Sequence, residues 1–153
     1  MKITDFLDEA TIIPALAGGE KRAVLQEMAN GLALRHEFLD AQRVLDVLLE
    51  REKISTTAIG EGVAIPHGKL PNVDRVLAIF ARSPEGVDFA ALDGGLTYLF
   101  FVLIAPENSA ADHLKALARI SRLLKDVGFR RRLMQAKTSR ELFAIIDEED
   151  QKF

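Results

Sequence analysis

The stretch from Leu96 to Ala105 is almost wholly apolar, and it constrains the fold more than any other part of the chain. A strand of that composition has to be covered on both faces, because hydrophobic side chains point to each side of it. Pro106 ends the run, and its longest apolar part, Tyr98 to Ala105, is far too short to span a bilayer. We therefore predict that Leu96–Ala105 is the central strand of a sheet.

Further strands are expected around this one. Arg75–Arg82 is apolar on both faces and predicts a second buried strand, and Thr11–Ile13 before Pro14 predicts a short edge strand. The segment Ser83–Gly86, which has proline at its second position, is typical of a turn. After this turn, Val87–Leu92 is predicted as a shorter strand.

Helical periodicity marks the rest of the chain. A first helix is expected from Glu20, because apolar residues fall on one face of the sequence that follows it. Asp40 is a good N-cap for a second helix, with Leu39 and Val44 as a hydrophobic staple. Three later helices are expected over Ser109–Lys125, over Val127–Ala136, and from Thr138 or Ser139 onward.

Two details of these later helices can be tested against the structure. Ser109 and Asp112 have the spacing of a capping box, and Asp147–Asp150 is typical of a frayed acidic end. Because strands and helices alternate without a linker or repeat, we predict the α/β class. The expected architecture is a single domain over residues 1–153, with a mixed β-sheet flanked by α-helices on both faces.

Composition excludes several classes of function. The chain has 153 residues, a net charge of −3 and no cysteine. It therefore lacks the basic field that holds nucleic acid, and it can form no disulfide. The N-terminus has no continuous apolar core and does not resemble a signal peptide, and no run is long enough for membrane insertion. We expect a cytoplasmic protein.

The stretch from Ser55 to Leu70 is where we expect the function to lie. His67 stands between Pro66 and Gly68, after the apolar run Val63–Ile65. Proline locks φ and glycine permits φ values that other residues avoid, so a short strand is expected to deliver this histidine to a turn with a fixed exit. The alternative is a turn histidine that makes structural hydrogen bonds only.

The sequence matches no nucleotide-binding or metal-binding motif in full. Gly60-Glu61-Gly62 begins a dinucleotide-binding pattern, but Ile65 occupies the position of the third glycine. Read as a phosphate-binding P-loop, Gly62–Lys69 is one residue too long, and Leu70 replaces the serine or threonine that binds magnesium. The three histidines have no metal-ligand spacing, so no metal site and no cofactor are predicted. His36 is expected to be a surface residue after the first helix.

The sequence from Thr57 to Leu70, TAIGEGVAIPHGKL, resembles the phosphorylation-site signature of the type 2 EIIA proteins of the phosphoenolpyruvate-dependent phosphotransferase system. Arg51-Glu52-Lys53 and Asp112-His113-Leu114 also lie where that family would place them, and the resemblance covers essentially the whole chain. It implies a mixed sheet between helices. It also implies phosphorylation of His67, with His113 bonding or facing the phosphorylated ring and Arg51 at the same site. From its helix position alone, Arg51 would be a snorkelling or dipole-compensating cation.

The chemistry of these residue types suits phosphoryl transfer. A neutral imidazole is nucleophilic near pH 7, and the transfer needs positioning and charge stabilisation rather than covalent help. Three groups are expected to stabilise the phosphoryl group: His113 at a helix N-terminus, the guanidinium of Arg51, and backbone N–H groups of a phosphate-binding nest at Gly60 and Gly62. For His113 a purely structural place at the edge of the core stays open.

The resemblance is greatest to the nitrogen-regulatory branch of the family. It implies a phosphocarrier that takes its phosphoryl group from an HPr-like protein of the NPr type and regulates targets such as transporters or sensor kinases. Two alternatives stay open. One is a sugar EIIA that passes the group to an EIIB of the fructose or mannitol type, and the other is an interaction module whose switching does not need phosphorylation.

Overall fold

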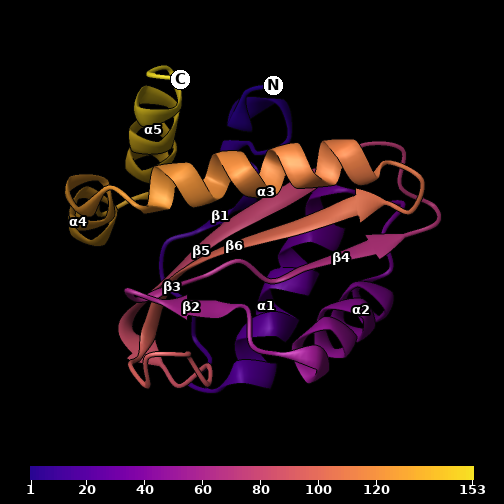
Figure 1. Ribbon diagram of the computed structural model, residues 1–153, viewed down its shortest axis with the longest axis horizontal. Coiled ribbons are helices and arrows are strands. Elements are labelled where there is room, and N and C mark those ends of the chain that lie inside the picture. Colours follow the sequence, from indigo (N-terminus) through magenta and orange to yellow (C-terminus); the bar gives the residue numbers. More distant parts are fainter.

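Strand β6 (Thr97–Pro106) lies at the centre of a six-stranded sheet in the computed structural model, which describes residues 1–153. On one side it pairs antiparallel with β5 (Leu77–Val87). On the other side β3 (Val63–Ala64) and β4 (His67–Leu70) follow one another, both parallel to it. At the edges, β1 (Ile12–Ile13) pairs parallel with β5, and β2 (Ala58–Gly60) pairs antiparallel with β3. The predicted mixed sheet is confirmed (Figure 1).

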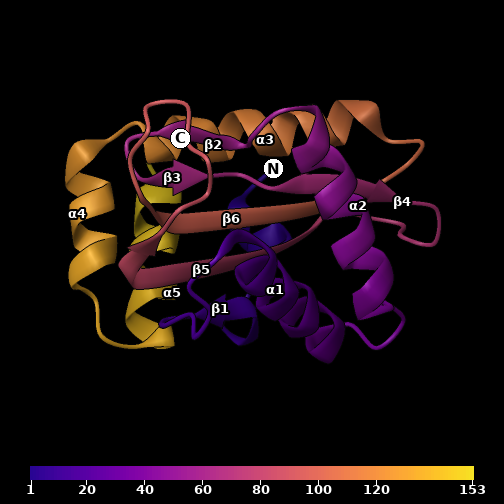
Figure 2. The same ribbon diagram turned by 90° about the horizontal axis from the view of Figure 1, so that it is seen from below.

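Successive side chains of β6 enter two separate cores, which is why the strand is apolar throughout. Leu99, Phe101 and Leu103 belong to one core, and Phe100, Val102 and Ile104 belong to the other. The second core is closed by α1 (Lys21–Arg35) and α2 (Ala41–Ile54). The first is closed by α3 (Ala110–Leu124), α4 (Val127–Gln135) and α5 (Ser139–Asp150). Helices thus cover both faces, as predicted (Figure 2).

Helix starts follow local side-chain chemistry in most cases. Asp40 caps α2 by accepting a hydrogen bond from the Gln42 backbone N–H at 2.9 Å, and Thr138 caps α5 by accepting from the Glu141 N–H at 3.1 Å. Helix α3 begins directly after Ser109 as expected, but the Ser109 side chain makes no capping hydrogen bond. The predicted capping box is therefore wrong, although the position of the helix start is right.

The predicted turn at Ser83–Gly86 is instead part of β5. The register with β6 shifts between Arg82 and Val87, so this segment forms a bulge in which the exposed Pro84 needs no ladder hydrogen bond. The Gly86 N–H donates to the Ser83 hydroxyl at 3.0 Å. This local hydrogen bond spans three residues, as one in a turn does, and it accounts for the resemblance of the sequence to a turn. The expected strand Val87–Leu92 is also wrong, because Val87 is the last residue of β5 and the residues after it form a loop with one isolated bridge at Asp88.

The acidic C-terminal residues are not frayed. Helix α5 runs through Asp150, whose side chain is fully buried. Its carboxylate accepts a hydrogen bond from the Ile3 N–H at 2.7 Å and pairs with Arg119 of α3. Asp150 therefore joins the two termini of the chain.

The expectation that His36 is a surface residue was also wrong, since this C-cap residue of α1 is only 9% exposed.

Candidate functional site

His67 is the first residue of β4, so the expected turn at this position is wrong. The chain leaves β3, passes Ile65 and Pro66, and pairs again with the same neighbour, β6, where His67 lies opposite Leu103. The carbonyl of Pro66 accepts a hydrogen bond from the Leu103 N–H at 3.0 Å. Because Pro66 has no N–H of its own, it fits the short gap between two strands. The histidine is half-buried at the start of a strand rather than exposed on a loop.

Gly68 serves a different purpose from the one predicted. It does not adopt a positive φ. A Cβ at this position would lie 2.9 Å from Cγ2 of Val47 and 3.2 Å from its Cβ. The glycine therefore lets α2 approach β4 closely, and it does not shape a turn. This close approach brings the C-terminal turn of α2, which carries Arg51, next to the His67 ring.

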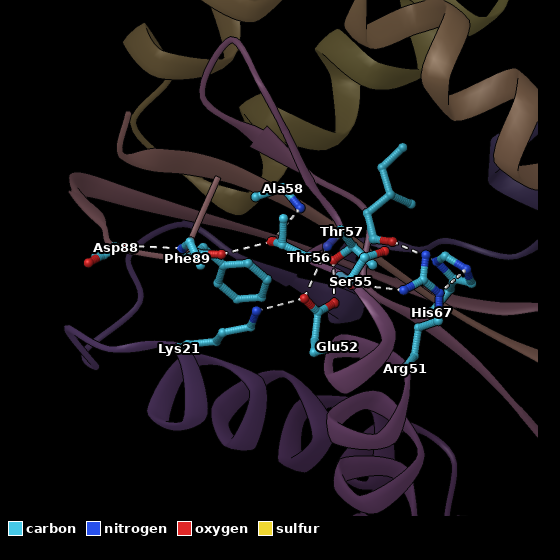
Figure 3. Close-up of polar contacts among 12 residues, drawn as sticks. Lys21, Arg51, Glu52, Ser55, Thr56, Thr57, Ala58, His67, Asp88 and Phe89 are labelled. Carbon is cyan, nitrogen blue, oxygen red and sulfur yellow. Dashed lines mark hydrogen bonds and ion pairs between the residues drawn. The ribbon is translucent and has the colours of Figure 1, made fainter. Parts of the chain in front are cut away.

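Arg51 contacts the imidazole directly. Its Nε–H donates to Nε2 of His67 at 3.3 Å, and its terminal N–H donates to the Ser55 carbonyl at 2.9 Å (Figure 3). The guanidinium thus bridges the histidine and the segment that follows α2. It places a permanent positive charge and several N–H donors beside Nε2.

Hydrogen bonding fixes which nitrogen of His67 carries the proton. Nδ1 lies 2.8 Å from the Ile65 carbonyl, which can only accept, so Nδ1 holds the proton and donates it. Nε2 then carries the lone pair and accepts from Arg51. Burial of the ring lowers the pKa of His67, and this effect exceeds the opposing hydrogen bond to Ile65, while the charge of Arg51 lowers the pKa further. The ring is therefore neutral near pH 7, with Nε2 as its nucleophilic atom.

His113 faces His67 from the first turn of α3. The two ring centroids lie 5.3 Å apart and the planes meet at 75°, an edge-to-face arrangement. His113 is only 6% exposed, and burial lowers its pKa to about 4, with further lowering by His67 and Lys69. It is therefore neutral near pH 7. Its Nε2 is buried and makes no hydrogen bond to another protein group.

Gly60 and Gly62 are not brought to the histidines. Both have positive φ, of 116° for Gly60 at the end of β2 and 76° for Gly62 in the turn that leads to β3. Val63, which follows Gly62, pairs with Leu99 of β6, and His67 pairs with Leu103. Val63 and His67 therefore lie opposite residues that are four positions apart along β6, or about 13 Å. The Glu61 N–H in the turn already donates to the Asp93 carboxylate at 3.1 Å. The predicted backbone nest therefore lies away from the imidazole.

Glu52 is a polar residue near the site for which the sequence predicted no role, although it belongs to the Arg51-Glu52-Lys53 segment. It is 9% exposed and bonds to Thr57 and to Lys21. A signal existed, because Glu52 follows Val44 and Leu48 at intervals of four on the buried face of α2. A carboxylate on an apolar stripe requires hydrogen-bonding partners, and Glu52 has them in Thr57 and Lys21.

Two further structural findings concern metals and membranes. No group of three or more histidine, cysteine, aspartate or glutamate side chains is arranged to hold a metal ion. None of the helices combines the length and the apolar character needed to cross a bilayer.

Comparison with known proteins shows the family of this chain. The family model described as "Phosphoenolpyruvate-dependent sugar phosphotransferase system, EIIA 2" matches residues 5–149. A nitrogen regulatory protein of Bradyrhizobium diazoefficiens is 43% identical over 146 residues, which cover 95% of each chain. The crystal structure of nitrogen regulatory protein IIA-Ntr from Neisseria meningitidis aligns with a TM-score of 0.88 at 33% identity, over 94% of this chain and 98% of that one.

A sugar-transport protein is also similar. The fructose-specific EIIABC component of Bacillus subtilis is 38% identical over 150 residues, which are 98% of this chain but only 24% of that protein. The similarity thus extends to both branches, and the nitrogen regulatory protein is matched along 95% of its own length. The chain belongs to the EIIA type 2 family of the phosphoenolpyruvate-dependent phosphotransferase system, as a homologue of the nitrogen-regulatory EIIA proteins.

Proposed function

We propose that this chain accepts a phosphoryl group onto Nε2 of His67 from a phosphohistidine on an HPr-like carrier of the NPr type. The observation that carries the proposal is the hydrogen bond from Nδ1–H to the Ile65 carbonyl, which leaves the lone pair on Nε2. Membership of a phosphoryl-carrier family and similarity to nitrogen regulatory proteins support it.

The proposed step balances within the two proteins. In this step the carrier's phosphohistidine holds a proton on its other ring nitrogen. The bond between phosphorus and the carrier's imidazole nitrogen breaks as a bond from phosphorus to Nε2 of His67 forms, and the carrier's ring leaves as a neutral imidazole that keeps its proton. Nδ1 of His67 keeps its proton throughout, so the ring gains positive charge, which the Ile65 carbonyl faces. The proposed transfer uses no nucleotide or metal, since the phosphoryl group arrives already activated on nitrogen.

Two neighbours would stabilise the transferred group. The Arg51 Nε–H, which donates to Nε2 at 3.3 Å in the resting site, would turn to an oxygen of the phosphoryl group once Nε2 is substituted. The unpartnered Nε2 of His113 would provide a second contact from the adjacent ring. Both groups already lie beside the reacting nitrogen, so little reorganisation is required.

The output we propose is regulatory. A phosphoryl group adds about two negative charges and several acceptor oxygens at the His67 surface. A partner that covers this surface with apolar or acidic groups would be released, while one with arginines would be retained. Transporters and sensor kinases are the partner classes that we expect. Transfer to an EIIB of the fructose or mannitol type is a second candidate function, favoured by the 38% identity to a fructose-specific protein.

The primary test is an intact-mass measurement after incubation with phosphoenolpyruvate and the upstream phosphocarriers. Wild type should gain one phosphoryl group and His67→Ala should gain none. The adduct should be labile in acid and stable in base, as nitrogen-linked phosphate is. A shift that persists in His67→Ala, or an acid-stable adduct, would redirect attention to Ser55, Thr56 and Thr57 and refute the assignment.

A second experiment separates the regulatory and sugar-transport functions. Phosphorylated protein is mixed with the EIIB proteins of its host, and partners are captured in parallel with wild type, His67→Ala and the phosphate-mimicking His67→Glu. Slow transfer to every EIIB and different partner sets for the two variants are expected. Rapid transfer to an EIIB together with identical partner sets would establish a sugar EIIA instead.

A further inference from the structure

A buried carboxylate lies behind the His67 site and contacts neither imidazole. Glu52, in the last turn of α2, accepts hydrogen bonds from the Thr57 backbone N–H at 3.0 Å and from the Thr57 hydroxyl. The same carboxylate pairs with Lys21 of α1 at 2.8 Å (Figure 3). Both of its oxygens are therefore used, and two of its three bonds hold one residue, Thr57.

Thr57 connects this carboxylate to Nδ1 of His67. Its carbonyl accepts a hydrogen bond from the Ile65 N–H at 3.2 Å, and the Ile65 carbonyl accepts from Nδ1–H of His67 at 2.8 Å. Ile65, whose carbonyl selects the tautomer of His67, is thus held through its own N–H by the residue that Glu52 holds. A displacement of Thr57 would move Ile65 and, with it, the acceptor for Nδ1–H.

The other ring nitrogen is connected to the same segment. Arg51, which donates to Nε2, also donates to the carbonyl of Ser55, two residues before Thr57. The segment Ser55–Thr57 therefore bonds both to Arg51, which donates to Nε2 of His67, and to Ile65, which accepts from Nδ1–H. Figure 3 shows Glu52 directly below this segment, with Arg51 and His67 to one side of it and Lys21 to the other.

The charge of the carboxylate is matched locally. The side chain of Glu52 is 4% exposed, and a buried carboxylate is costly without a partner. Lys21 provides that partner, and its ammonium also lies 4.6 Å from the centroid of the Phe89 ring. Because any shift of Glu52 would break several bonds at once, the arrangement restricts Thr57 to one position.

We propose that Glu52, with Lys21 as its counter-ion, is a positioning residue for phosphoryl transfer to His67. It fixes the Ser55–Thr57 segment, and this segment holds the acceptor of Nδ1–H and the donor to Nε2. This inference rests on the proposed function. A role in stability alone would leave the tautomer of His67 and the ratio of transfer rate to carrier affinity unchanged.

The test isolates hydrogen bonding from charge and size. In Lys21→Met/Glu52→Gln, the amide can still accept from the Thr57 N–H and donate to the Thr57 hydroxyl, and no ammonium is left unpaired. In Lys21→Met/Glu52→Met, a side chain of similar length makes neither bond. Glu50→Gln is the control, because Glu50 is an exposed residue of the same helix that pairs only with Lys53.

Three readouts are compared: the tautomer of His67 from nitrogen-15 NMR of the unphosphorylated protein, the single-turnover rate from the phosphorylated carrier, and the Kd for that carrier. The glutamine double variant should keep the Nδ1–H tautomer and most of the rate. The methionine double variant should populate both tautomers and transfer roughly 10- to 100-fold more slowly at unchanged Kd, since misplacing a reactive group by about 1 Å can cost about 10²-fold. The Glu50→Gln control should match wild type.

The results distinguish the two proposals. Equal rates and equal tautomers for the two double variants would overturn the positioning role of Glu52. If wild type itself takes up no phosphoryl group, the proposed function fails, but the tautomer comparison still decides whether Glu52 fixes the ring.

Discussion

Replacing Gly68 by alanine should separate α2 from β4 and thereby disturb the His67 site. The added Cβ would lie 2.9 Å from Cγ2 of Val47. Carbon atoms prefer a separation of about 3.5–4.0 Å, so the helix and the strand must move apart by at least roughly 0.6 Å. Overpacking of this size should lower the free energy of unfolding by about 1–2 kcal/mol.

The same movement should slow phosphoryl transfer. Arg51 lies one helical turn beyond Val47, and its Nε–H is already 3.3 Å from Nε2 of His67. A further displacement of this size breaks that hydrogen bond. We expect a rate loss of up to about 10²-fold in single-turnover transfer, since a misplacement of about 1 Å can have this effect.

A double-mutant cycle with Val47→Ala tests the steric explanation. Removing Cγ2 of Val47 relieves the closest contact, although the Cβ of residue 47 would still lie 3.2 Å from the new Cβ. Gly68→Ala should therefore cost clearly less in the Val47→Ala background, with coupling of about 1 kcal/mol by urea unfolding. An equal cost of Gly68→Ala in both backgrounds would refute the reasoning.

Three further predictions follow from buried polar groups. His113→Ala should slow single-turnover transfer on the order of 10²-fold while leaving carrier affinity nearly intact, and a wild-type rate would make the residue purely structural. Because the folded-state pKa of His113 is about 4, against 6.5 in the unfolded chain, only the unfolded chain takes up this proton as the pH falls between these values. The free energy of unfolding, measured with urea, should therefore fall by up to about 3 kcal/mol between neutral pH and about pH 4.5, and it should fall less in His113→Gln. An equal fall in wild type and His113→Gln would contradict the lowered pKa of His113. Asp150→Asn should lower the free energy of unfolding by about 3 kcal/mol, because it leaves the charge of Arg119 without its carboxylate and weakens the hydrogen bond to the Ile3 N–H. Urea unfolding at neutral pH measures this loss, and an unchanged stability would show that the C-terminal turn is dispensable.

Much of the architecture was predictable because it depends on local pattern. The apolar run in β6 indicated a doubly covered strand, and alternate residues do enter two cores. Asp40 fixed the start of α2, since an N-cap acts within its own helix turn. Val87–Leu92 failed as a strand because the bulge at Pro84 lets β5 continue to Val87 before the chain leaves the sheet.

The parts that could not be predicted depend on long-range neighbours. The buried state of Asp150 depends on Ile3, which is 147 residues away in the chain. Gly60 and Gly62 lie close to His67 in sequence, but β3 and β4 run on along β6 in one direction and carry them apart. The proximity of Arg51 and His113 to His67 was an implication of the family resemblance, because no pattern within α2 or α3 indicates which strand each residue faces.

Burial lowers the pKa values of His67 and His113, and the same burial supports the proposed chemistry. Burial removes water from both rings, lowers the pKa of each and so keeps Nε2 of His67 available as a nucleophile. The same burial leaves Nε2 of His113 without a hydrogen bond to another protein group. A phosphoryl group on His67 would bring acceptor oxygens to the neighbourhood of that atom and of Arg51. The two side chains beside His67 are thus placed to contact the phosphoryl group in the proposed phosphorylated state.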